Sequence, residues 1–123
     1  MPSLSIEREE QVVCKAEWTV GEEHVAQHLA GRGKLVLSTP CLALFMEATA
    51  RMCLDELLGD RRTSVGYRVD VKHRRSVGVG ERVIVEARLA SFDGRRALFI
   101  ITARDPQGEI IGEALNERYV VEG

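Results

Sequence analysis

The sequence is poor in the residues that build metal centres, disulfide frameworks and membrane anchors. Its 123 residues include three cysteines, three histidines, three prolines and one tryptophan. No apolar run approaches the ~20 residues that a membrane-spanning helix needs. The first ten residues lack the basic and then apolar order of a signal peptide. We therefore expect a cytoplasmic protein that does not bind a membrane.

The cysteine pattern excludes a disulfide framework as the basis of the fold. The number of cysteines is odd, and they are widely spaced and set among apolar residues, at Cys14, Cys41 and Cys53. This pattern favours reduced intracellular thiols. The histidines are scattered as well, and no Cys/His cluster has the spacing of zinc ligands. The sequence therefore predicts no metal site.

The chain also lacks an excess of charge of either sign. Lys and Arg total 17 against 19 Asp and Glu, a formal net charge of −2, whereas general nucleic-acid binders are strongly basic. The composition is 45% hydrophobic and 29% charged, which is typical of a soluble globular domain. At this length we expect one domain, residues 1–123, with a core of its own.

One long helix dominates the middle of the chain. Thr39 is a suitable N-cap, Pro40 suits the first helical position, and Gly59-Asp60 ends the helix after Leu58. Its length is roughly 30 Å at 1.5 Å per residue. Apolar residues cover most of its circumference and leave Arg51 and Asp55 as an exposed strip, which predicts a helix wrapped by a sheet.

Strand patterns lie on both sides of this helix. The expected strands are Val12–Val20 before it and then Val65–His73, Arg82–Ala90, Arg95–Arg104 and Glu109–Val121. Asp93-Gly94 and Pro106 to Gly108 supply tight turns between the last three, so these form an antiparallel meander. We predict an α+β fold in which an antiparallel sheet curves around one helix.

The first strand after the helix carries the strongest functional signal. Val65, Tyr67, Val69 and Val71 alternate with polar residues, and His73 shares their parity, so its imidazole is expected to face the core. Glu47 is one of the few charges on the apolar helix. An inward imidazole and an inward carboxylate are costly unless they form a site.

Together these stretches resemble the hot-dog fold, and more narrowly the fluoroacetyl-CoA thioesterase-like family. The matching pieces are His24–Gly31 into Val36–Pro40, Met46–Ala48, Val65–His73 and Gly112–Val121. The resemblance implies a catalytic threonine, glutamate and histidine at Thr39, Glu47 and His73. It also implies that the Gly66 backbone lines the substrate carbonyl, and that two copies form a homodimer with sites at the interface.

The chain departs from the family at two places. Arg74 to Gly78 replaces a turn that often contains proline, and Asn116 stands where a histidine often precedes Glu-Arg. Both lie outside the three catalytic positions, so they bear on substrate choice. Arg74 and Arg75 are either solvated charges or contacts to the phosphates of coenzyme A.

Each candidate also has a plain structural interpretation. Thr39 caps the helix in any case, and Gly66 can be a bulge or packing glycine. Cys41, beside the helix N-terminus, is an alternative nucleophile, but local spacing places no histidine next to it.

The resulting prediction is an acyl-CoA thioesterase that hydrolyses a small acyl-CoA without a metal or redox cofactor. Glu47, Thr39 or water attacks the thioester, and His73 moves the proton. Two other functions fit the same fold, a non-catalytic acyl-CoA-binding module and an enoyl-CoA hydratase or dehydratase.

Overall fold

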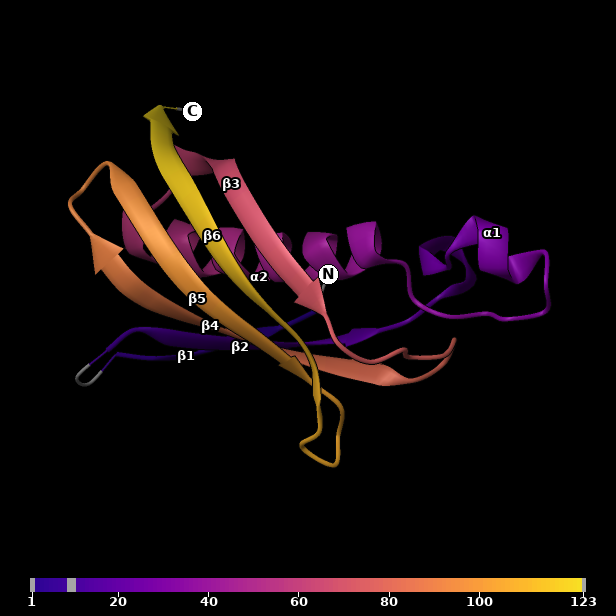
Figure 1. Ribbon diagram of the computed structural model, residues 1–123. Helices are drawn as coiled ribbons and strands as arrows, with labels where there is room; N and C mark the ends of the chain where they lie inside the picture. The colour runs from indigo at the N-terminus through magenta and orange to yellow at the C-terminus, as the bar shows by residue number, and fades with distance from the viewer. Residues whose placement is uncertain (1, 9–10, 123) are drawn as a thin grey trace.

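A six-stranded antiparallel sheet curves around one long helix in the computed structural model, which describes residues 2–8 and 11–122 (Figure 1). The strands are β1 (Leu4–Glu7), β2 (Val13–Thr19), β3 (Arg62–His73), β4 (Arg82–Phe92), β5 (Arg96–Arg104) and β6 (Ile110–Glu122). The helices are a 3₁₀ turn (Glu22–His24), α1 (Gln27–Ala30) and α2 (Thr39–Leu58). This is the predicted α+β hot-dog arrangement, with β1 as an additional strand that the sequence patterns do not reveal.

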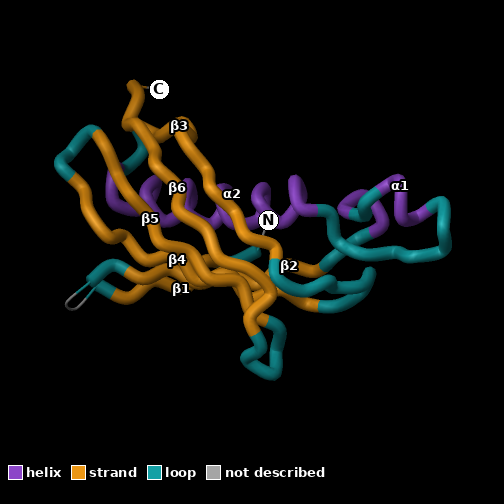
Figure 2. The backbone as a smooth tube through the Cα atoms, viewed as in Figure 1, coloured by secondary structure: helices purple, strands orange, loops and turns teal. Residues whose placement is uncertain are grey.

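The order of strands across the sheet is β1-β2-β4-β5-β6-β3. Strands β4, β5 and β6 are consecutive antiparallel neighbours, which confirms the predicted meander. Helix α2 lies across one face of the sheet, and α1 lies beyond the N-terminal end of α2 (Figures 1 and 2). Strand β3 forms one edge of the sheet and pairs only with β6 among the described strands.

The apolar circumference of α2 explains why the sheet wraps it. Leu42, Phe45, Met46 and Leu54 are at most 1% exposed, and they pack in one cluster with inward residues of β2, β4, β5 and β6. Fully burying an aliphatic or aromatic side chain contributes about 1.5–3 kcal/mol. Because this face holds α2 firmly on the sheet, the positions of its polar residues are set by the core.

The expected alternation along β3 is wrong in its first half. Pairing with β6 shifts between Gly66 and Arg68, which leaves Tyr67 as the extra residue of a β-bulge. Successive side chains of a strand point to opposite faces of the sheet. One extra residue therefore changes whether the odd-numbered or the even-numbered residues face the helix. Val65 and Tyr67 are therefore exposed rather than buried, whereas His73 faces the helix as predicted.

The expectation of three reduced thiols is also wrong. Cys14 on β2 and Cys53 on α2 form a disulfide, with their Cα atoms 5.8 Å apart, and both residues are fully buried. The two cysteines are 39 residues apart in sequence, so only the packing of the helix on the sheet brings them together. Cys41 is a free thiol.

Glycines occupy the turns that the sequence identifies. Gly94 in the β4–β5 hairpin and Gly108 in the β5–β6 hairpin have φ of 95° and 91°, a conformation that favours glycine. Gly59 ends α2 with φ of 81°. Within residues 2–8 and 11–122, no helix is long and apolar enough to span a membrane.

Candidate active site

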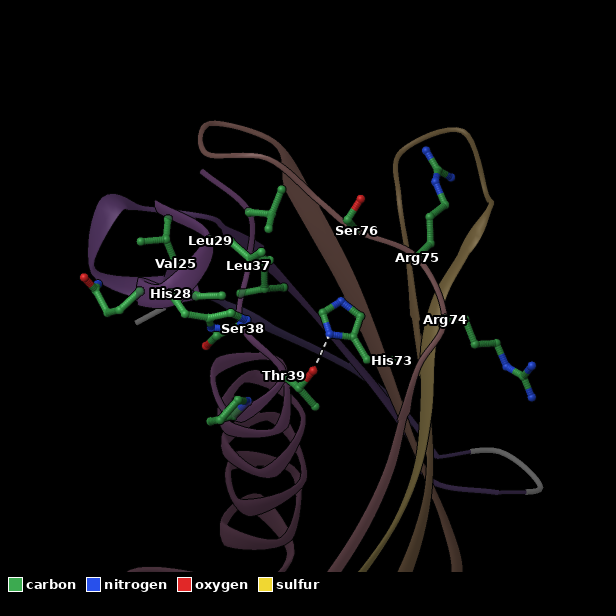
Figure 3. Close-up of a pocket in the computed structure, with 14 residues that line it drawn as sticks. Val25, His28, Leu29, Leu37, Ser38, Thr39, His73, Arg74, Arg75 and Ser76 are labelled. Atoms are coloured by element: carbon green, nitrogen blue, oxygen red, sulfur yellow. Dashed lines mark hydrogen bonds between the residues drawn. The ribbon is translucent and has the colours of Figure 1, made fainter. Parts of the chain in front are cut away.

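A pocket of about 640 Å³ opens where the N-terminus of α2, the end of β3 and the α1 segment meet (Figure 3). Val25, Leu29, Val36 and Leu37 give it an apolar wall. The polar residues that line it are Gln27, His28, Ser38, Thr39, His73, Arg74, Arg75 and Ser76. Ligand pockets are typically lined by apolar side chains with a few polar groups, so this pocket is suited to a small apolar group next to reacting polar atoms.

Thr39 and His73 meet inside this pocket. The Thr39 hydroxyl and Nδ1 of His73 share a hydrogen bond of 2.8 Å (Figure 3). The predicted N-cap at Thr39 is wrong by one residue, because Ser38 is the cap and its hydroxyl accepts from the Cys41 N–H. Thr39 is the first helical residue instead. Its hydroxyl is therefore not engaged in capping and is free to bond the imidazole.

The environment of His73 favours a neutral imidazole. Burial lowers the pKa of His73 from its usual 6.5, and the neighbouring Arg75 backbone opposes this only in part. Its second ring nitrogen, Nε2, is buried and has no hydrogen-bond partner among the described residues. Buried polar atoms are nearly always paired, so an unpaired nitrogen in a pocket points to a group that binds there.

Arg74 and Arg75 are among the residues that line the pocket, but they direct their side chains away from His73 (Figure 3). The Arg74 guanidinium pairs with Glu113 at 2.9 Å, and both side chains are largely exposed. Arg75 pairs at 2.7 Å with Asp105, whose side chain is buried in the β5–β6 turn. Burial raises the pKa of Asp105, but the Glu109 N–H and the Arg75 guanidinium outweigh it and lower that pKa below its usual value.

Glu47 belongs to a second cluster, further along α2. An added Cβ on Gly66 would overlap the Glu47 carboxylate, so this carboxylate lies directly against the β3 backbone. Nη1 of Arg118 lies 3.4 Å from Glu47 Oε2. A smaller pocket of about 390 Å³ opens here, lined by Trp18, Leu44, Glu47, Ala48, Arg51 and Arg118.

One chain therefore places the predicted catalytic residues in two separate groups. Thr39 lies with His73, and Glu47 lies with Gly66. Glu47 follows Thr39 by eight residues of the same helix, a rise of ~12 Å at 1.5 Å per residue. The carboxylate and the imidazole are on the same face of the sheet but do not contact each other.

Three buried polar residues that are not among the predicted catalytic or substrate-binding residues complete the second cluster. Arg118 is 4% exposed and Asn116 is fully buried, and both come from the face of β6 that packs toward α2. The signal in the sequence is weak, since it consists of two polar residues at i and i+2 in a strand. Ser64 is also buried. The sequence pattern does not predict this, because the bulge changes which residues of β3 face the helix.

A metal centre and a cysteine nucleophile are two further chemical options. In residues 2–8 and 11–122 no group of three or more His, Cys, Asp or Glu side chains could hold a metal ion. Cys41 is half-buried and does not line the pocket of Thr39 and His73.

Comparison with known proteins identifies the family of the chain. The family model of the fluoroacetyl-CoA-specific thioesterase matches residues 20–123. A solved fluoroacetyl-CoA thioesterase is 23% identical, with a TM-score of 0.80 over 94% of this chain and 90% of that chain. A variant of it has been solved with fluoroacetate and CoA.

Two further solved structures show the same fold. A hot-dog-like protein from Thermanaerovibrio acidaminovorans is 23% identical, with a TM-score of 0.79 over 91% of this chain and 82% of that chain. A thioesterase superfamily member from Thermus thermophilus is 22% identical, with a TM-score of 0.79 over 93% and 84% of the two chains. None of the curated proteins matches the chain in sequence.

Proposed function

Since the chain belongs to the fluoroacetyl-CoA-specific thioesterase family and is thus a thioester hydrolase, we propose that it hydrolyses a small acyl-CoA with Thr39, Glu47 and His73. The observation that carries this proposal is the hydrogen bond of Thr39 to His73 inside a pocket. The reaction converts R–CO–S–CoA and water into the carboxylic acid and free CoA.

His73 is the proposed proton carrier. A neutral imidazole accepts a proton from the attacking oxygen and later donates it to the departing CoA thiolate. The hydrogen bond to Thr39 fits either tautomer of the ring. If Nδ1 accepts, Thr39 is activated or oriented as a nucleophile; if Nδ1 donates, Nε2 is the base toward water.

Glu47 is proposed as the carboxylate that attacks the thioester or activates water. The backbone N–H of Gly66, the residue against which the carboxylate lies, is the proposed donor to the oxyanion that forms at the thioester carbonyl. All of these groups come from the chain itself, and the proposed route uses no metal or redox cofactor.

A second copy of the chain would join the two clusters into one site. The outer edge of β3 is unpaired among the described strands, and an antiparallel copy of β3 can extend the sheet there. If the two-fold axis passes at Asp70, so that Asp70 lies opposite its own copy, the bulge at Tyr67 puts His73 of one subunit opposite Gly66 of its partner. Glu47, which lies against Gly66, then reaches the imidazole across the interface. We therefore propose a homodimer with two shared sites.

Arg74 and Arg75 are the proposed contacts to the phosphates of CoA. Both lie at the pocket that holds His73. The Arg74–Glu113 pair is exposed, and such pairs contribute only about 0–1 kcal/mol, so a phosphate can replace Glu113. Arg75 also neutralises the buried Asp105, which makes it the less available of the two.

Incubation with acyl-CoAs of graded length, with thiol release as the readout, tests the activity. We expect hydrolysis of at least one short acyl-CoA. A protein-only control corrects for Cys41, the free thiol. Binding without turnover would instead identify an acyl-CoA-binding module, and addition of water to an enoyl-CoA would identify a hydratase.

Subunit mixing tests the shared site. Glu47→Ala and His73→Ala homodimers each lack one residue in both sites, whereas a mixed dimer keeps one complete site. Random mixing should therefore restore about a quarter of the wild-type activity, because half of the dimers are mixed and each has one intact site. No recovery after subunit exchange, or a fully active monomer by light scattering, would refute the shared site.

A further inference from the structure

Arg118 is a buried cation whose position calls for an explanation. It is 4% exposed on β6, and burying a charge is costly unless partners compensate it. Its Nε donates to the Ser64 hydroxyl at 2.8 Å and Nη2 donates to the Ser64 carbonyl at 3.2 Å. Nη1 donates to Oδ1 of Asn116 at 3.1 Å. These neutral groups hold the guanidinium in one orientation.

The one carboxylate that this guanidinium contacts in the described chain is Glu47. Nη1 of Arg118 lies 3.4 Å from Glu47 Oε2, and it also lies 3.4 Å from the point where a Cβ of Gly66 would be. The guanidinium, the carboxylate and the glycine backbone therefore meet at one place. The Glu47 side chain remains 34% exposed, so substrate has access to its other side.

Asn116 connects the same guanidinium to the β-bulge. Its Nδ2 donates to the Arg68 carbonyl at 2.9 Å, directly after the register shift between Gly66 and Arg68. Arg118 pairs with Gly66 across the β3–β6 ladder. One hydrogen-bond network thus controls both the carboxylate and the backbone segment against which it lies.

We propose that Arg118 is a positioning residue for the hydrolysis, which acts through Glu47 by holding its carboxylate over Gly66. This inference rests on the proposed function, since it requires Glu47 to take part in the reaction. Ser64 and Asn116 orient the guanidinium, and the guanidinium orients Glu47. Lysine, a point charge on a flexible stem, cannot reproduce the planar set of donors.

A purely structural role for Arg118 makes a different prediction. If it served only to join β3 to β6, its replacement would lower the melting temperature, and its effect on kcat would not depend on residue 47. A double-mutant cycle between the two positions separates these roles, because residues that act through each other are not additive.

The test compares Glu47→Gln, Arg118→Lys and the double variant in thioester hydrolysis. We expect Arg118→Lys to lower kcat by roughly 10- to 100-fold with KM changed less than about threefold, because a misplaced carboxylate affects the reaction step. In the Glu47→Gln background, the same replacement should change kcat by less than about twofold. Arg96→Lys is the matched control, since Arg96 lies over the Tyr119 ring and is exposed; it should leave kcat unchanged.

Three results would overturn the inference. They are additive effects in the cycle, near-normal kcat in Arg118→Lys, and an equal loss in Arg96→Lys. If Glu47→Gln itself keeps normal turnover, the assignment of Glu47 in the proposed function fails first, and that result is distinct from the other three. If Arg118→Lys does not fold, Ser64→Ala serves in its place, with an expected loss of about three- to tenfold in kcat that disappears in the Glu47→Gln background.

Discussion

The hydroxyl of Thr39 lies 2.8 Å from Nδ1 of His73, so one hydrogen bond joins the first residue of α2 to the last residue of β3. The backbone at each end of this bond belongs to a regular element. Helix α2 is held by the core of the sheet, and β3 is held by its ladder with β6. The imidazole is therefore positioned by two rigid elements, which is the arrangement that proton transfer requires.

Replacement of Glu47 or His73 should remove most of the activity. We expect Glu47→Gln and His73→Ala each to lower kcat by about 10²–10⁴-fold, the usual contribution of a positioned acid or base. Steady-state kinetics on the best acyl-CoA measures this. Glu47→Gln should also lower the melting temperature, because it leaves the buried Arg118 without a carboxylate. Near-normal turnover in either variant would assign that residue a structural role.

Substitutions at Thr39 and at Ser38 should distinguish a role in catalysis from a role in capping α2. Thr39→Val should lower kcat with little change in melting temperature, because the Thr39 hydroxyl bonds His73 and does not cap α2. Thr39→Ser should keep most of the activity. Ser38→Ala should mainly lower stability, by about 1 kcal/mol, because it removes the cap on the Cys41 N–H. Equal losses of kcat and stability in all three would contradict this division.

Gly66→Ala should lower the activity because the new side chain collides with Glu47, without straining the backbone. Its φ is not positive, so alanine fits the backbone, but the added Cβ overlaps the Glu47 carboxylate. We expect kcat to fall by at least about 10²-fold as the carboxylate is displaced. Gly31→Ala is the control, since its nearest neighbour would be the His28 carbonyl at 4.0 Å. The idea fails if both variants are equally active.

The lowered pKa of His73 predicts the direction of two pH effects. The unfolded chain titrates near 6.5 and the folded imidazole below it, so the unfolded state binds more protons between these values. The stability linked to His73 is complete above pH 6.5 and is lost as the pH falls through the lowered pKa. The melting temperature of the wild type should therefore decline more steeply below pH 6.5 than that of His73→Gln. The acidic limb of kcat/KM should also lie below pH 6.5, and a limb above it would contradict the assignment.

Substitutions of Arg74 and Arg75 should have different effects on substrate binding and stability. Arg74→Gln should raise KM and weaken inhibition by free CoA, with an unchanged melting temperature, because remote phosphate contacts supply uniform binding. Arg75→Gln should in addition lower the melting temperature, since Asp105 loses its cation. Arg82→Gln is a matched control, because Arg82 forms an exposed ion pair with Glu17 away from the pocket. If KM is unchanged in both site variants, the phosphates bind elsewhere.

Much of the fold follows from local patterns. The bounds of α2 follow from Pro40, Gly59 and the apolar residues between them, and the β4–β6 meander follows from Asp93-Gly94 and Gly108. These signals are reliable because capping, turn conformation and periodic burial act over a few residues. Strand β1 carries no such signal, and its pairing with β2 depends on a partner further along the chain.

The residue types of the candidate site were determined by the sequence, but their grouping was decided by the tertiary structure. A motif names Thr39, Glu47 and His73, yet helix geometry keeps Glu47 about 12 Å along the axis from Thr39. The bulge at Tyr67 reverses the parity of β3, and the pairing of β3 with β6 brings Arg118 and Asn116 to Glu47. The Cys14–Cys53 disulfide likewise depends on packing across 39 residues. Such contacts arise only when separate elements share one core, and no local pattern encodes them.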